Sequence, residues 1–184
     1  GEIAFSKFLE NPSKGILFRE SLITDLDTIN YPARHLLENS NYIWSVPGKG
    51  IKPMATIMTS RGCPFKCTFC SQKVTFGNTV RYRSVGNVIE ELAHVVEKYN
   101  IRHFSVLDDT LGLNHEKTFQ LCDAIIAEKL NITFEGYTRV NVVTYELLQK
   151  LKSAGLNRIS FGVESGNQNI LDAVKKGTTL DQIR

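Results

Sequence analysis

The sequence lacks the marks of several protein classes. No apolar stretch approaches the ~20 residues that a membrane-spanning helix needs, and runs such as 51–58 are far shorter. The N-terminus has no basic start followed by an apolar run and a cleavage site, so we expect a cytoplasmic location. Lysine and arginine are scattered and the formal net charge is only +3, so charge does not indicate a nucleic-acid partner.

Cysteine is scarce and unevenly placed. Three of the four cysteines, Cys63, Cys67 and Cys70, lie within eight residues. A secreted disulfide framework would spread its cysteines over many loops, so this cluster indicates metal binding or redox chemistry instead. Cys122 lies alone in a helical pattern of apolar residues, and we predict that it is a buried, small, apolar side chain.

Proline divides the chain into two parts. Four of the five prolines lie at or before Pro53, and the fifth, Pro64, is inside the cysteine loop. We therefore predict a connector over residues 1–53, with one short helix at about 33–39, and a regular domain over 54–184. In that domain, hydrophobic periodicity predicts strands that alternate with helices. The strands are expected at 54–59, 102–107, 132–137 and 157–162, and the helices at 85–99, 114–129, 144–155 and 167–174.

This alternation indicates parallel strands joined by right-handed crossovers, in either a barrel or an open, doubly wound sheet. Because the last residues, 182–184, stop inside a helical pattern, we expect a fragment of a longer protein. A sheet cut after its fourth strand would leave an exposed edge, so the isolated piece is expected to be partly unstable or oligomeric.

Polar residues follow every predicted strand. In parallel α/β folds, ligands bind at the carboxyl ends of the strands, so these residues predict a binding site. They are the three cysteines after the first strand, Asp108, Asp109 and Thr110 after the second, Arg139 and Asn141 after the third, and Glu164 and Ser165 after the fourth.

The cysteine loop leaves three kinds of site open. The spacing of Cys63, Cys67 and Cys70 suits three ligands of a four-iron, four-sulfur cluster whose fourth iron remains free for a cofactor. A structural zinc site normally has four ligands, and no histidine lies in the loop. A thiol–disulfide pair of Cys67 and Cys70 would leave Cys63 without a role. An enzyme, a non-catalytic zinc- or cluster-binding module and a redox protein are therefore the alternatives.

Three segments resemble the radical SAM (S-adenosylmethionine) superfamily. Thr59-Ser-Arg-Gly-Cys-Pro-Phe-Lys-Cys-Thr-Phe-Cys70 is similar to its signature loop. Phe104-Ser-Val-Leu-Asp-Asp-Thr110 is similar to its second-strand segment as written in the cobalamin-associated branch. Phe161–Leu171, followed by Lys175–Thr179, is similar to its fourth-strand segment. The resemblance implies a partial TIM-like barrel with about four of an expected six βα units.

The resemblance also implies cofactors. Cys63, Cys67 and Cys70 would ligate a 4Fe-4S cluster, and the amine and carboxylate of S-adenosylmethionine would chelate the fourth iron. A reductant such as flavodoxin or ferredoxin would supply the electron. Cleavage of S-adenosylmethionine would then yield a 5′-deoxyadenosyl radical, which abstracts hydrogen from a small-molecule substrate that the sequence does not identify.

Roles for five further residues follow from the same resemblance. Phe69 would pack near adenine, and Glu164 would accept hydrogen bonds from the ribose hydroxyls. Asp108 and Asp109 would lie near the methionine ammonium, unless they are solvated acids at the start of a helix. Arg139 would meet a carboxylate, either of the ligand or in an ion pair with Glu135 or Glu164.

The connector indicates which branch of the superfamily the chain resembles. Leu26-Asp-Thr-Ile-Asn-Tyr-Pro-Ala-Arg-His-Leu-Leu37 resembles the linker that precedes the radical core in methyltransferases and in anaerobic magnesium-protoporphyrin ester cyclase. Cobalamin would be bound by a domain outside these residues, because no cobalamin motif is present. The tRNA methylthiotransferases share the cysteine loop and remain an alternative. No glycine-rich triplet follows the second strand, and the fifth- and sixth-strand segments that complete the S-adenosylmethionine pocket are missing.

Overall fold

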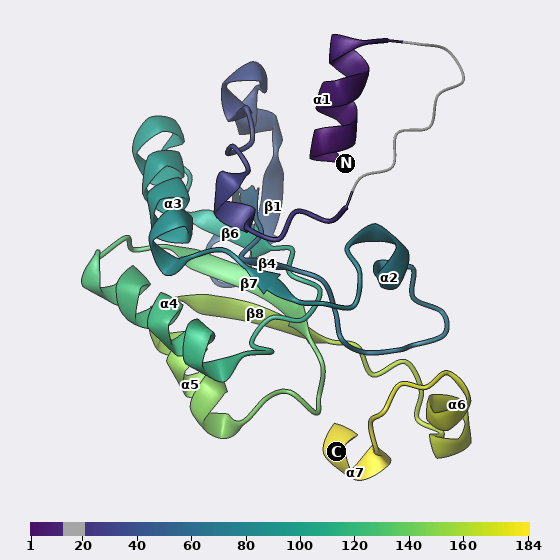
Figure 1. Cartoon of the computed structure of the whole chain (residues 1–184). Helices are drawn as coiled ribbons and strands as arrows, with labels where there is room; N and C mark the ends of the chain where they lie inside the picture. The colour runs from purple at the N-terminus through teal and green to yellow at the C-terminus, as the bar shows by residue number, and fades with distance from the viewer. Residues whose placement is uncertain (13–20) are drawn as a thin grey trace.

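The computed structural model describes residues 1–12 and 21–184. Its centre is a four-stranded parallel sheet in the order β3-β6-β7-β8 (Figure 1). The strands are β3 (Ala55–Ile57), β6 (His103–Val106), β7 (Thr133–Thr138) and β8 (Leu156–Phe161). The helices that follow them are α3 (Val85–Tyr99), α4 (His115–Ala127), α5 (Tyr145–Ala154) and α6 (Gln168–Ala173), and α7 (Leu180–Ile183) comes last. The predicted partial barrel of four parallel βα units is confirmed.

The three long helices begin and end where local chemistry requires. Ser84, Asn114 and Thr144 each accept a hydrogen bond from the backbone N–H three residues later, which caps α3, α4 and α5. Helix α5 ends at Gly155, whose φ is 115°. A Cβ at this position would lie 2.4 Å from the carbonyl oxygen of Ile132, so the turn into β8 requires glycine.

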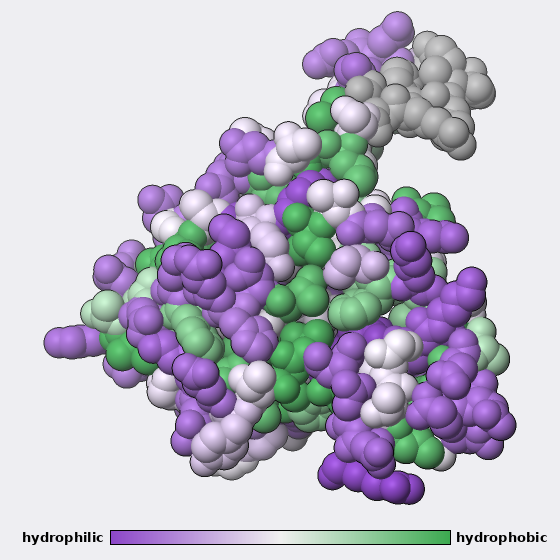
Figure 2. Space-filling view, turned by 60° about the horizontal axis from the view of Figure 1, so that its bottom comes forward, coloured by the Kyte–Doolittle hydropathy of each residue, from purple (hydrophilic) through white to green (hydrophobic). Residues whose placement is uncertain are grey.

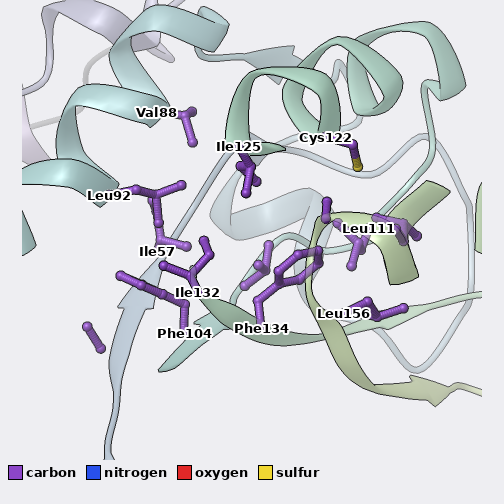
Figure 3. Close-up of a cluster of buried hydrophobic side chains, with 14 of the residues drawn as sticks. Ile57, Val88, Leu92, Phe104, Leu111, Cys122, Ile125, Ile132, Phe134 and Leu156 are labelled. Atoms are coloured by element: carbon purple, nitrogen blue, oxygen red, sulfur yellow. The ribbon is translucent and has the colours of Figure 1, made fainter. Parts of the chain in front are cut away.

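The two faces of the sheet differ in polarity because successive side chains of a strand point to opposite faces. Helices α3, α4 and α5 cover one face, and Figure 3 shows Ile57, Phe104 and Phe134 packed there against helix side chains. The opposite face carries polar groups. Glu135 forms an ion pair with Arg158 at 3.3 Å, although Arg158 is partly exposed.

The connector contains more structure than its sequence predicts. The helix expected at about 33–39 is a single 3-10 turn, η2 (Arg34–Leu36), between two others, η1 (Leu26–Thr28) and η3 (Asn39–Asn41). A β-hairpin of β1 (Ile43–Val46) and β2 (Gly50–Pro53) and the helix α1 (Glu2–Glu10) were not predicted.

The hairpin lies at the amino ends of the sheet strands. The carbonyl oxygen of Ser45 accepts a hydrogen bond from Arg158 at 3.2 Å, and that of Pro47 accepts one from Asn157 at 3.3 Å. The hairpin is thus on the side of the sheet away from the carboxyl ends, where ligands bind in this class of fold.

Buried charges hold the connector against the sheet. Arg34 and Arg83 both form ion pairs with Glu91 of α3, at 2.7 and 2.5 Å, and Glu91 is only 2% exposed. Arg34 also donates to the carbonyl oxygen of Thr56 at 2.7 Å, and Arg83 donates to that of Met58 at 2.9 Å. The pair of arginines therefore fixes the end of β3, which leads directly into the cysteine loop.

The surface is mixed rather than uniformly polar. Figure 2 shows a band of apolar side chains that runs between polar side chains on either side. Within residues 1–12 and 21–184, no helix combines the length and the apolar character needed to cross a membrane.

Candidate functional site

The cysteine loop lies at the carboxyl end of β3 and is closed at its base. Two short strands, β4 (Ser60–Arg61) and β5 (Arg81–Tyr82), pair in antiparallel fashion on either side of it. The loop begins at Gly62, whose φ is 103°, and a Cβ there would lie 2.4 Å from the carbonyl oxygen of Thr79. Only glycine can occupy this position without displacing the backbone, which explains the glycine that precedes Cys63.

Each of the three loop sulfurs has a hydrogen-bonding partner. Cys63 Sγ lies 3.8 Å from the hydroxyl of Thr110. Cys67 Sγ accepts from Arg139 Nη1 at 3.3 Å. Cys70 Sγ accepts from the backbone N–H of residue 72 at 3.4 Å. All three thiols are free; the first two are half-buried and the third is exposed.

The donor set is three thiols in one loop, which is the ligand type of iron–sulfur clusters. In the described part of the chain, no three His, Cys, Asp or Glu side chains converge on one point where a metal ion could bind. The thiolates of a cubane cluster each bind a different iron, so they need not converge. Hydrogen bonds to ligand sulfurs are also a usual feature of protein-bound clusters. Cys63, Cys67 and Cys70 therefore have the chemistry that such a cluster requires.

The two acids after β6 have different hydrogen-bonding partners. Asp108 is 4% exposed, and its carboxylate accepts four hydrogen bonds, two from Thr59 and two from Ser60. Burial raises the pKa of Asp108, and those hydrogen bonds oppose the rise. Asp108 thus holds the segment between β3 and the cysteine loop, a role that was not predicted from the sequence.

Asp109 faces the cysteine loop. Its carboxylate accepts from the backbone N–H of Gly62 at 3.0 Å and from the side-chain amide of Gln72 at 2.5 Å. Burial also raises the pKa of Asp109. The predicted contact of either aspartate with a ligand ammonium stays a prediction, and the geometry favours Asp109 because Asp108 is fully occupied.

Arg139, at the end of β7, is 5% exposed and contacts the cysteine loop directly. Its guanidinium carbon lies 3.7 Å from the centre of the Phe65 ring. Neither predicted ion pair forms, because Glu135 pairs with Arg158 and Glu164 pairs with Lys176. The sequence did not reveal these pairings, because the register of β7 with β8 brings Glu135 to Arg158, and the fold of the chain after β8 brings Lys176 to Glu164.

Glu164 and Phe69 lie near one buried cation. Glu164 follows β8 with a φ of 65°, and its carboxylate contacts Lys176 Nζ at 2.8 Å. The same nitrogen lies 6.0 Å from the centre of the Phe69 ring, and Phe69 is 57% exposed. Lys176 was not predicted as a site residue, although it belongs to the Lys175–Thr179 segment that resembles the family. The predicted ribose and adenine contacts of Glu164 and Phe69 stay predictions.

Cys122 is separate from this site. It is 2% exposed and belongs to the hydrophobic core between α4 and the sheet, as predicted (Figure 3). Burial raises the pKa of its thiol to about 11, so the thiol is neutral at physiological pH.

Comparisons with known proteins agree with this geometry. The family model of the radical SAM superfamily matches residues 57–184. An uncharacterized methyltransferase of Pyrococcus horikoshii is 33% identical over 200 residues, which cover 99% of this chain and 42% of that protein. The anaerobic magnesium-protoporphyrin IX monomethyl ester cyclase of Rubrivivax gelatinosus is 33% identical over 165 residues, which cover 89% of this chain and 29% of that protein. The chain thus spans less than half the length of these curated relatives.

A solved structure shares the fold. The radical S-adenosylmethionine methyltransferase TsrM of Kitasatospora setae, with cobalamin and a 4Fe-4S cluster bound, aligns with a TM-score of 0.63 at 18% identity. The alignment covers 68% of this chain and 26% of that chain. The match of the family model to residues 57–184 and the similarity to the two relatives place this chain in the radical SAM superfamily of enzymes.

Proposed function

We propose that the chain is the cluster-binding part of a radical SAM enzyme of the cobalamin-associated branch. In this proposal Cys63, Cys67 and Cys70 bind a 4Fe-4S cluster, and S-adenosylmethionine binds at the remaining iron. The observation that carries the proposal is the loop itself: three free thiols at the carboxyl end of β3, each with a hydrogen-bonding partner. Residues 54–184 form the radical core in this proposal, and residues 1–53 form the connector.

The bound cluster and S-adenosylmethionine supply one-electron cleavage of a carbon–sulfur bond, the chemistry that defines the superfamily. This chain's own residues bind and orient the reactants. The Asp109 carboxylate accepts a hydrogen bond from the methionine ammonium, and the Glu164 carboxylate accepts hydrogen bonds from the ribose hydroxyls. Phe69, which is exposed, packs near adenine. Lys176 holds the Glu164 carboxylate in place at 2.8 Å, so one carboxylate oxygen remains free for the ligand.

The relatives favour two overall reactions. Their names include methyltransferases and an ester cyclase, so this enzyme catalyses cobalamin-dependent methyl transfer or oxidative cyclisation of a small molecule in our proposal. A protein reductant such as flavodoxin or ferredoxin supplies the electron. Cobalamin is bound by a domain other than the residues described.

The test is anaerobic reconstitution with iron and sulfide, followed by iron and sulfide counting and EPR of the dithionite-reduced protein with and without S-adenosylmethionine. We expect about four irons per chain and an EPR signal that changes when S-adenosylmethionine is added. Cys67→Ala should lose the cluster, whereas Cys122→Ala, which removes a thiol from the core, should keep it.

The alternatives give different results in the same experiment. Stoichiometric zinc without a cluster would refute the enzyme and support a structural metal module. Two reactive thiols without bound metal would support a redox protein. A cluster signal that does not respond to S-adenosylmethionine would support the three ligands and contradict cofactor binding by this chain.

A further inference from the structure

The guanidinium of Arg139 is fixed on every side. Nη1 donates to Cys67 Sγ at 3.3 Å, Nε donates to Asn141 Oδ1 at 3.2 Å, and Nη2 donates to the carbonyl oxygen of Lys176. The flat face of the group lies on the Phe65 ring at 3.7 Å. An arginine held by three hydrogen bonds and a stacking contact has no freedom to turn away from the sulfur.

The charge of Arg139 has no carboxylate partner among the described residues. The two acids that the sequence suggested as partners are engaged elsewhere, Glu135 with Arg158 and Glu164 with Lys176. Arg139 is only 5% exposed, so water screens its charge weakly. Burial of an arginine without an acid is costly unless another negative group compensates it. The group in contact is Cys67 Sγ, which is anionic when it serves as a metal ligand.

The other two loop sulfurs have neutral partners. Cys63 lies beside a threonine hydroxyl, and Cys70 accepts from a backbone N–H. A charged donor forms a hydrogen bond roughly twice as strong as a neutral one. The environment of the three sulfurs is therefore asymmetric, with the full positive charge at Cys67.

From this asymmetry we infer that Arg139 sets the reduction potential of the cluster through Cys67. The inference rests on the proposed function, because it assumes that Cys67 is a cluster ligand. Reduction adds one negative charge to the cluster. The guanidinium stabilises the reduced form more than the oxidised form and thereby raises the potential. Arg139 acts through Cys67, so it is a positioning residue.

The segment after α6 keeps this arginine in place. The backbone N–H of Thr68 donates to the carbonyl oxygen of Val174 at 2.9 Å, and Asn141 Nδ2 donates to that of Gly177 at 3.3 Å. Together with the carbonyl of Lys176, these contacts join the cysteine loop, the end of β7 and residues 174–177. The Lys-Lys-Gly segment at 175–177 therefore has a structural role, because its backbone carbonyl groups bind Arg139 and Asn141.

The test is a redox titration of the reconstituted protein with a low-potential viologen mediator, monitored by EPR. For Arg139→Gln we expect a reduction equilibrium constant about tenfold smaller, which corresponds to a midpoint potential about 59 mV lower for a one-electron couple. Arg139→Lys keeps the charge but loses the planar contacts, so its potential should lie between those of Arg139→Gln and the wild type. Because arginine stays protonated throughout, the difference should be the same at pH values on either side of neutrality.

Arg102→Gln is the matched control. Arg102 also donates to a backbone carbonyl, that of Leu130 at 2.7 Å, but it lies just before the amino end of β6. Its removal changes the net charge by the same amount and should leave the potential unchanged.

The outcomes separate this inference from the proposed function. A wild-type protein without about four irons would refute the proposed function. An Arg139→Gln protein with a full cluster and an unchanged potential would refute the tuning role alone. If that variant does not assemble a cluster, Arg139→Lys decides: a potential below that of the wild type supports the inference, and an unchanged potential overturns it. Loss of the cluster in both variants also overturns it, because Arg139 would then serve assembly.

Discussion

The buried Arg34–Glu91–Arg83 triad allows a direct test of how the connector is attached. Glu91 is 2% exposed, and its two oxygens contact Arg34 and Arg83 at 2.7 and 2.5 Å. Glu91→Gln preserves the shape of the side chain and removes its charge. The two guanidinium groups keep their backbone acceptors, the carbonyl oxygens of Thr56 and Met58, but lose the only acid that compensates them among the described residues.

The expected cost is large because the charges that remain are shielded from water. Arg34 is 7% exposed and the Arg83 side chain 11%. Removal of one partner from a buried ion pair typically costs about 3–5 kcal/mol. We expect about 3 kcal/mol here, because the remaining backbone hydrogen bonds partly solvate the arginines. In a chain of this size, that corresponds to a fall in Tm of roughly 6–12 °C.

The assay is urea denaturation followed by circular dichroism, with Glu97→Gln as the control. Glu97 is on the same helix and exposed, so its neutralisation should change stability by about 0.5 kcal/mol or less. Arg34→Met combined with Glu91→Gln should cost less than the sum of the single changes, because both remove the same interaction. Equal stabilities for the Glu91 and Glu97 variants would refute the reasoning.

Three other predictions concern separate positions. Burial raises the pKa of Asp108, so the folded state holds that proton more tightly than the unfolded chain, and the contribution of Asp108 to stability falls as pH rises from about 4. The unfolding free energy of the wild type minus that of Asp108→Asn, measured by urea denaturation, should therefore fall toward neutral pH, and a difference that rises would contradict this. Cys122, with a pKa of about 11, should resist iodoacetamide at pH 8 in the folded, cluster-free protein while the three loop thiols react, as read by mass spectrometry. Gly155→Ala should cost about 2 kcal/mol or more, whereas Gly86→Ala, where no atom lies within 4 Å of the added Cβ, should stabilise by about 0.5 kcal/mol; thermal unfolding that ranked these two in the opposite order would rule out the strain at residue 155.

Much of the fold was predictable because its signals are local. Apolar residues at helical spacing and the caps Ser84, Asn114 and Thr144 mark where the helices form. Alternation of strands with helices of this length leaves parallel pairing as the natural arrangement. The three clustered cysteines limit the loop to a few kinds of site, and the resemblance of the surrounding residues favours an iron–sulfur cluster among them.

The connector and the environment of the site were decided by contacts between distant residues. The hairpin at 43–53 alternates too briefly to stand out in the sequence, and buried Arg34 finds its partners, Glu91 and the carbonyl oxygen of Thr56, far along the chain. Likewise, Asp108 and Asp109 are adjacent in sequence, yet Asp108 is bound by Thr59 and Ser60 and Asp109 by Gly62 and Gln72.

The sequence by itself therefore determined the four βα units and the order of their strands along the chain, and it predicts which three cysteines would bind a cluster. Only the tertiary structure decided which charge contacts which sulfur. Arg139 and Cys67 are 72 positions apart, and their contact depends on how β7, the cysteine loop and the segment after α6 pack together. Such a contact has no periodicity in the sequence, because it arises from the packing of elements and not from the conformation of any one of them.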